Sequence, residues 1–203
     1  MNLLAVDTTG EALSIALRAG ERVFAVHRKL QAPHDETLLS RVESLLARAR
    51  LKLEDLDAVA AAAGPGRFTG IRIGMAYAAI VAARLKIPVL ALSRLEAAAF
   101  KTPGRLVCAS LPGYRQERLY QLFRRRGRVP RPAGKPSWSS PQEWPLVRAA
   151  LETQGAVVFE GETVAADLLE PAAFYLGRGR APKFEPLYLK PAGYERDKAR
   201  PIR

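Results

Sequence analysis

The chain has 203 residues, of which 48% are hydrophobic and 26% charged, a balance typical of a soluble globular protein with a well-filled core. Its formal net charge of +12 favours nucleic acid or an acidic protein as a partner, and a solvated basic surface explains it equally well. The single cysteine excludes an internal disulfide. No apolar run is long enough to suggest a membrane span, and the first residues lack the features of a signal peptide. We therefore expect a cytoplasmic protein.

Residues 1–103 carry the patterns of one complete α/β unit. Apolar segments joined by tight turns predict an antiparallel meander of three strands over residues 2–30. A Leu-rich stripe then predicts a helix over residues 35–50, and a continuous apolar run predicts a strand, buried on both faces, that ends at Gly64. A second helix from Thr69 to about Leu85, a strand over 87–93 and a short helix ending near Phe100 complete the unit.

Residues 104–203 form the second predicted region, a smaller basic lobe with an extended tail. The segment KTPG at 101–104 marks the boundary. Strands are predicted at 105–111, 118–125 and 156–161, a loop at 127–139, a helix starting at Ser140 and a short helix at 171–177. The region 101–203 holds 19 Lys and Arg against 10 Asp and Glu, and the stretch from Arg115 to Lys135 holds eight against one.

Two turns are candidates for phosphate binding. Asp7, Thr8 and Thr9 follow the first strand, where backbone N–H groups and hydroxyls can donate to a phosphate and Asp7 can lie near a metal. The same residue types also form ordinary turns. Gly64 and Gly66 precede a helix N-terminus, which a phosphate can approach. Their spacing matches neither a P-loop nor a dinucleotide fingerprint, so spacing alone favours a simple strand-to-helix turn.

Motifs for metal binding and nucleophilic catalysis are missing from the sequence. The two histidines, His27 and His34, belong to different predicted elements, and a single cysteine cannot supply a zinc cluster. Neither HExxH nor GxSxG occurs. We therefore predict no metal site and no catalytic residue in this chain.

The helix after the Gly-Pro-Gly turn is apolar on nearly every face. Small residues recur along it at intervals of four, which places them in one row that another helix can approach closely. We expect this helix to form a partner interface, with the second lobe or the preceding helix as the alternative cover. The predicted interface residues are Gly70, Gly74, Tyr77, Ala78, Val81 and Ala82.

Several of these stretches together resemble the TsaB (YeaZ) family, bacterial proteins needed to make threonylcarbamoyladenosine beside the anticodon of tRNA. The resemblance rests on AVDTTG…ALSIAL, on His34 before a Leu-rich helix, and on GPGRFTGIRIG. Near the C-terminus, EPLYLK is similar to the family's Pro-x-Tyr-Leu-Arg element, with Lys190 replacing arginine. The family's Asp-Ala-Arg…Glu-Val-Tyr run reads Gly113-Tyr114-Arg115…Arg118-Leu119-Tyr120 here, without its acids.

The resemblance implies an α/β fold of the actin-like, sugar-kinase-like ATPase class (ASKHA), with two lobes of which the second is reduced. It also implies a non-catalytic subunit that pairs with the catalytic paralogue TsaD and with the ATPase TsaE. ATP and a metal ion then belong to the assembled complex, and we expect no cofactor to be bound by this chain alone. Self-association as a homodimer is expected from the apolar helix, and no membrane contact is expected.

The residue inventory agrees with a non-catalytic role. An ATPase of this fold needs a second Asp/Gly phosphate loop, yet after residue 104 the aspartates are Asp167 and Asp197, and neither precedes a glycine. The five residues of the two candidate turns are then vestigial nucleotide-binding positions. We expect the basic region to contact tRNA within the complex through Arg124, Arg125 and Arg126.

Two other function classes stay open on the sequence alone. One is a stand-alone phosphotransferase, or a glycoprotease-type peptidase, of the same fold, against which the missing second phosphate loop and the missing metal motif both count. The other is a basic RNA-binding module, although no RNA-binding signature accompanies the charge. The discriminating observation is whether the isolated chain hydrolyses ATP or cleaves protein.

Overall fold

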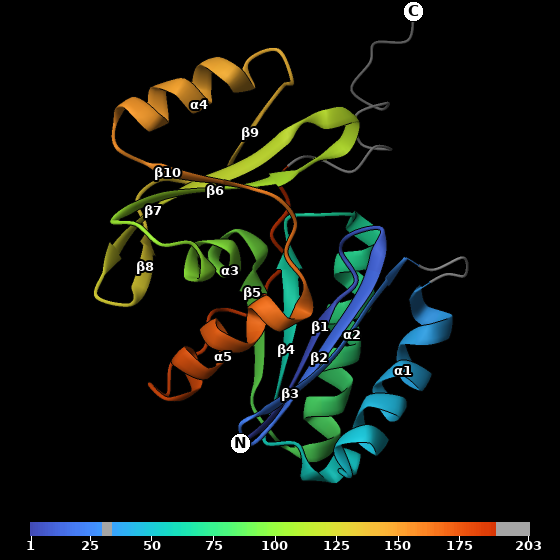
Figure 1. Ribbon diagram of the computed structural model, residues 1–203. Coiled ribbons are helices and arrows are strands. Elements are labelled where there is room, and N and C mark those ends of the chain that lie inside the picture. Colours follow the sequence, from blue (N-terminus) through green and yellow to red (C-terminus); the bar gives the residue numbers. More distant parts are fainter. Residues whose placement is uncertain (30–33, 190–203) are drawn as a thin grey trace, which may run out of the picture.

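Two β-sheets organise the chain, one above the other in the view of Figure 1. The computed structural model describes residues 1–29 and 34–189. The first sheet has the order β3-β2-β1-β4-β5. Its strands are β1 (Asn2–Asp7), β2 (Ala12–Ala19), β3 (Arg22–Lys29), β4 (Ala58–Gly64) and β5 (Val89–Ser93). β1, β2 and β3 are antiparallel neighbours, whereas β4 runs parallel to both β1 and β5.

The second sheet has the order β10-β6-β7-β8, and β9 also pairs with β7. Its strands are β6 (Leu106–Pro112), β7 (Arg118–Arg126), β8 (Val129–Pro132), β9 (Ser137–Ser139) and β10 (Val157–Glu160). The helices are α1 (His34–Ala49), α2 (Phe68–Leu85), α3 (Arg94–Lys101), α4 (Trp144–Thr153) and α5 (Leu169–Leu176), with short 3-10 turns η1 (Leu53–Asp55), η2 (Tyr114–Gln116) and η3 (Ala165–Leu168).

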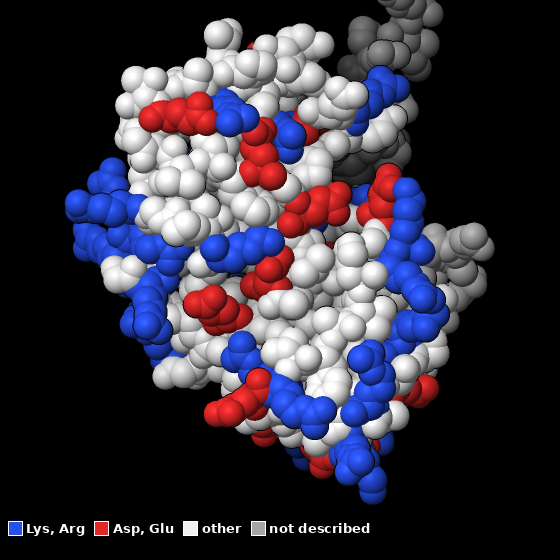
Figure 2. All heavy atoms as spheres, in the orientation of Figure 1, with Lys and Arg blue, Asp and Glu red and all other residues white. Residues whose placement is uncertain are grey.

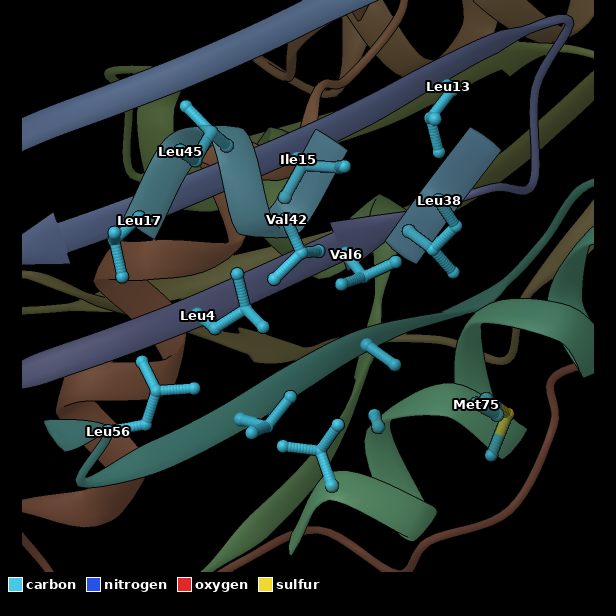
Figure 3. Packing of buried hydrophobic residues seen from close by; sticks show 14 of the residues in the cluster. Leu4, Val6, Leu13, Ile15, Leu17, Leu38, Val42, Leu45, Leu56 and Met75 are labelled. Atoms are coloured by element: carbon cyan, nitrogen blue, oxygen red, sulfur yellow. The ribbon is translucent and has the colours of Figure 1, made fainter. Parts of the chain in front are cut away.

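Helices cover both faces of the first sheet, and the alternation of side chains along its strands decides which residues meet them. Leu4 and Val6 of β1 point into the layer under α1 and α2, while Leu3 and Ala5 point to the opposite face. Figure 3 shows α1 facing β1 and β2 across this layer. The opposite face is covered by η3 and α5, which come from the last third of the described chain.

The helix α3 lies between the two sheets (Figure 1). Leu95, Ala98 and Ala99 of α3 form a buried cluster with β6 and with Phe123 of β7. The outer face of the second sheet is covered by α4, whose Trp144 packs near Cys108 and donates from its indole nitrogen to Glu160 Oε1 at 2.6 Å. The second sheet is therefore joined to the first through a shared helix.

One described helix, α2, is long and apolar enough to cross a membrane by length and composition. This is weak evidence, because the core helix of a soluble protein passes the same test. Ile71, Met75 and Ala78 of α2 lie in the core against the first sheet. Packing inside the protein thus explains the apolar residues on the inward face of α2.

The predicted elements of the first region are all present, and the second region differs in two places. The stretch predicted as a loop over 127–139 contains β8 and β9, which pair with β7. The helix predicted to start at Ser140 begins at Trp144, although the capping pair of Ser140 and Glu143 does form in the preceding turn. The domain boundary between residues 103 and 104 stays a prediction. η3 and α5 follow this boundary in the sequence, yet they pack against the first sheet.

Candidate functional site

The first candidate site lies where β1 ends and the chain turns toward β2. Asp7, Thr8 and Thr9 are almost completely buried there, with 3%, 1% and 1% of their surfaces exposed. Asp7 Oδ1 accepts hydrogen bonds from the backbone nitrogen of Thr9 at 2.9 Å and from its hydroxyl at 2.6 Å. The Thr8 hydroxyl donates to the carbonyl of Gly70 in α2. These donors and acceptors are satisfied by the chain itself.

The second oxygen of Asp7 faces an arginine from the first turn of α3. Arg94 is 4% exposed, and its Nε lies 3.2 Å from Asp7 Oδ2. The same guanidinium donates to the hydroxyl of Thr163 at 3.0 Å and to the carbonyl of Pro65 at 3.1 Å. Arg94 therefore ties together the end of β1, the Gly-Pro-Gly turn and the segment that leads into η3.

Arg94 belongs to no sequence motif, and its role was not predicted. A signal was present, because a basic residue in the first turn of a helix faces the positive end of the helix dipole and is unfavourable there without an acidic partner. The partner, Asp7, is 87 residues away in sequence, so no local pattern connects them. The pairing of Asp7 with Arg94 could therefore not be predicted from a local sequence motif.

The Gly-Pro-Gly turn closes against the same loop. The backbone nitrogen of Arg67 donates to the carbonyl of Thr9 at 2.8 Å, and a Cβ added at Gly66 would lie 2.7 Å from Thr9 Cβ. A Cβ at Gly70 would collide with the carbonyl of Thr8. The glycines serve a close contact between two stretches of this chain.

The tail crosses over the same turn from outside. The backbone nitrogen of Leu187 donates to the carbonyl of Ala63 at 2.7 Å. The ring of Tyr188 stacks on Phe68 with 4.7 Å between centroids, and its hydroxyl accepts from Arg72 Nε at 3.3 Å. The near-terminal EPLYLK stretch thus lies over the N-terminus of α2, with Lys190 outside the described residues.

These contacts decide whether the two turns fit a nucleotide. Metal-bound phosphate needs a free carboxylate and free N–H donors. Both oxygens of Asp7 already have partners in Thr9 and Arg94, and the positive charge of Arg94, 3.2 Å from Asp7 Oδ2, disfavours a second cation beside this carboxylate. The residues present do not fit ATP with a metal ion. Among the side chains that the structure describes, those of residues 1–29 and 37–189, no three His, Cys, Asp or Glu form a group that could hold a metal.

The predicted partner interface on α2 was wrong in its choice of face. The small residues face the chain's own sheet, because Ala78 is 0% and Ala82 4% exposed. Val81 belongs to the same core, and Gly70 and Gly74 lie against the loop that contains Thr8. The row of small residues lets α2 approach β1 and β4 closely, so none of these five residues is available to a partner.

The outward face of α2 is largely apolar, and the described part of the chain leaves it exposed. Ile80 is 68% exposed, Ala76 and Ala83 are exposed, and Ile73 and Tyr77 are half-buried. Beside it on α1, Leu39 is 56% exposed. Burial, and to a smaller extent the charge of Glu43, raises the pKa of Tyr77 to about 12, so its hydroxyl stays neutral. Tyr77 is the one predicted interface residue that borders this face.

The three predicted tRNA contacts lie on two faces of β7. Arg124 and Arg126 of β7 are exposed, while Arg125, on the other face of the strand, is half-buried. The Arg125 guanidinium donates to the carbonyls of Ala99 and Thr102, both at 2.6 Å. Arg125 is held at the C-terminal end of α3 and was wrongly predicted as a phosphate contact.

Of the two histidines, only His27 has a described side chain. His27 lies exposed on the edge strand β3. His34 begins α1, and its side chain lies outside the described part of the chain. The buried thiol of Cys108 has its pKa raised to about 12 by burial and then by Glu160, so it is not a nucleophile at neutral pH.

Comparison with known proteins connects this geometry to a family. Residues 26–144 match the family model described as TsaD, tRNA N6-adenosine threonylcarbamoyltransferase. The protein named tRNA threonylcarbamoyladenosine biosynthesis protein TsaB is 36% identical in Haemophilus influenzae, over 49% of this chain and 42% of that protein. The protein of the same name in Escherichia coli is 36% identical over 47% of this chain and 41% of its own length. The chain spans about half the length of the curated relatives it matches.

A solved structure covers nearly the whole chain. YeaZ from Pseudomonas aeruginosa matches with a TM-score of 0.75 and 28% identity, over 93% of this chain and 99% of that one. The match confirms the predicted fold class, a mixed α/β protein with two sheets of the ASKHA type. An uncharacterised protein of Mycobacterium leprae is 32% identical over 94% of this chain and 48% of its own.

Proposed function

Since the chain belongs to the TsaB (YeaZ) family, we propose that it is a non-catalytic subunit of the bacterial complex that places a threonylcarbamoyl group on the adenosine next to the tRNA anticodon. Its partners in this proposal are the catalytic paralogue TsaD and the ATPase TsaE, in the cytoplasm. ATP and the metal ion are bound by those partners and not by this chain.

The observation that carries the proposal is the closed state of the Asp7 loop. Arg94 supplies an internal positive charge at 3.2 Å from Asp7, and Thr9 donates twice to the other carboxylate oxygen, so both oxygens already interact with groups of this chain. This observation also counts against a stand-alone phosphotransferase, and the lack of a metal-ligand group in the described residues counts against a metal-dependent peptidase.

The outward face of α1 and α2 supplies the surface for a partner subunit. Leu39 and Ile80 are more than half exposed, and isolated apolar side chains of this size on adjacent helices are typical anchors of helix-on-helix interfaces. We infer that this face binds either TsaD or a second copy of this chain, one at a time. A stable interface of ordinary size would cover about 800 Å² on each partner.

Reconstitution tests the proposal directly. Purified TsaD, TsaE and threonylcarbamoyl-adenylate are combined with unmodified tRNA, with and without this chain, and threonylcarbamoyladenosine is measured by mass spectrometry. Modification should depend on the chain, while the chain alone should neither hydrolyse ATP nor cleave protein. ATP turnover by the isolated chain that is lost in Asp7→Ala would contradict the non-catalytic role.

A further inference from the structure

We propose that the β7–β8 hairpin is a docking site for the phosphate backbone of RNA, formed by Arg124, Arg126, Arg128 and Arg131. The inference deepens the proposed function and rests on it for the identity of the RNA, an unmodified tRNA.

All four arginines are exposed. Figure 2 shows Lys and Arg gathered at the left edge of the molecule, over β8 and its turn, with no Asp or Glu among them. Elsewhere on the surface, arginines such as Arg148 pair with carboxylates at short range. Within the part of the chain that the structure describes, no ion pair joins any of the four hairpin arginines to an acid.

The pairing of the strands places three of the arginines on one face of the hairpin. Arg124 stands directly opposite Arg131, and Arg126 stands opposite Val129 next to the turn. Arg124 and Arg126 are separated by two residues of one strand, or about 7 Å. Like charges directly opposite each other destabilise a β-hairpin. A bound polyanion would remove that repulsion, and its regularly spaced phosphates match a row of cations.

The opposite face of the hairpin holds it in place. The Arg125 guanidinium donates to the carbonyls of Ala99 and Thr102 in the C-terminal turn of α3 and to the carbonyl of Arg128 at 2.7 Å. Pro130 and Pro132 restrict the backbone of β8. The outward arginines therefore project from a fixed ribbon, which lowers the entropy lost when they bind an extended anion.

The chemistry of this surface favours RNA over an acidic protein. Protein interfaces depend on a few large apolar or aromatic anchors, and the exposed large hydrophobic residues of the described chain include none between Tyr114 and Trp138. All four cations are arginines, whose planar guanidinium matches phosphate oxygens in a bidentate arrangement. A surface of arginines without an apolar anchor suits a phosphate backbone and reads no base sequence.

The test compares two triple variants with the same loss of charge. Arg124→Gln/Arg126→Gln/Arg131→Gln removes the hairpin face, and Arg18→Gln/Arg22→Gln/Arg28→Gln removes three arginines from β2 and β3. Binding of the full chain to a fluorescent, unmodified tRNA transcript is measured by anisotropy from low to high salt. At low salt, the hairpin variant should bind tRNA more than about tenfold more weakly than the wild-type chain. The slope of the logarithm of the association constant against the logarithm of the salt concentration, which is negative, should become smaller in magnitude by about 2 to 3.

The control variant should retain most of the wild-type affinity and slope, and circular dichroism melts show whether both variants are folded. Equal losses in the two variants would mean that only net charge matters and would overturn the proposal. An unchanged slope in the hairpin variant would overturn it too. Binding of poly-glutamate without binding of tRNA would point to an acidic protein and overturn it as well. The reconstitution assay reports on the proposed function separately, because it requires TsaD and measures modification.

Discussion

At the scale of single residues, the buried pair of Asp7 and Arg94 is the contact on which the closed loop depends. Removing one partner of a buried ion pair leaves an uncompensated charge and costs about 3 to 5 kcal/mol. We expect Arg94→Met to lose that much unfolding free energy in urea denaturation. The matched control is Lys101→Met, whose pair with Asp167 at 2.8 Å is partly exposed and should cost about 1 kcal/mol or less. Equal costs would show that Arg94 does not hold the loop.

Glu96, two residues further along α3, gives a prediction about pH. Burial raises the pKa of the Glu96 carboxyl, and a hydrogen bond from the Tyr175 hydroxyl at 2.6 Å lowers it by less. The folded protein therefore binds this proton more tightly than the unfolded chain does. Its contribution to stability is fully present below the unfolded pKa near 4.5 and is lost as the pH rises through the higher folded value.

The Glu96→Gln variant isolates this effect. A neutral amide cannot be charged, and its oxygen still accepts the hydrogen bond from Tyr175. The free energy of unfolding of the variant, relative to the wild-type chain, should therefore rise between pH 4.5 and pH 7. Parallel urea titrations at the two pH values measure it. A difference that stays constant with pH would show that the buried carboxyl does not titrate in this range.

At the scale of elements, the two faces of α2 respond differently to a charge. Ile80 is 68% exposed, so Ile80→Asp should change the unfolding free energy by about 0.5 kcal/mol or less and should abolish association with TsaD and with a second copy. Ala78 is fully buried, and Ala78→Asp should leave the chain unfolded. Sedimentation velocity with and without TsaD measures both effects. An Ile80→Asp chain that still associates would place the interface elsewhere.

The elements also show where sequence analysis succeeds and where it ends. Periodicity predicts β1 and α1 because the apolar positions that define them are local. β8 and β9 were missed because four prolines between residues 130 and 141 favour a loop, and these strands form only because β7 offers a partner. The small residues of α2 were predicted as a partner interface, yet they pack against the chain's own sheet, because their spacing does not reveal whether a sheet or a partner lies against them.

At the scale of the whole molecule, the sequence boundary near residue 103 divides a chain that packs across it. Leu168, Leu169 and Ala172 fill the face of the first sheet opposite α1 and α2. A fragment of residues 1–103 would expose that face, and we expect it to aggregate or to lack a dispersed amide NMR spectrum. Adding the fragment 104–203 in trans should restore dispersion. A fragment 1–103 that folds alone would confirm an independent lobe.

The bonds of Arg94 to the end of β1, to the Pro65 carbonyl and to Thr163 also bear on signalling. These three contacts hold segments that lie far apart in the sequence in one arrangement. Under the proposed function, the chain would present that same arrangement to a partner whether ATP or ADP is present. The timing of the reaction cycle would then be set by TsaD and TsaE.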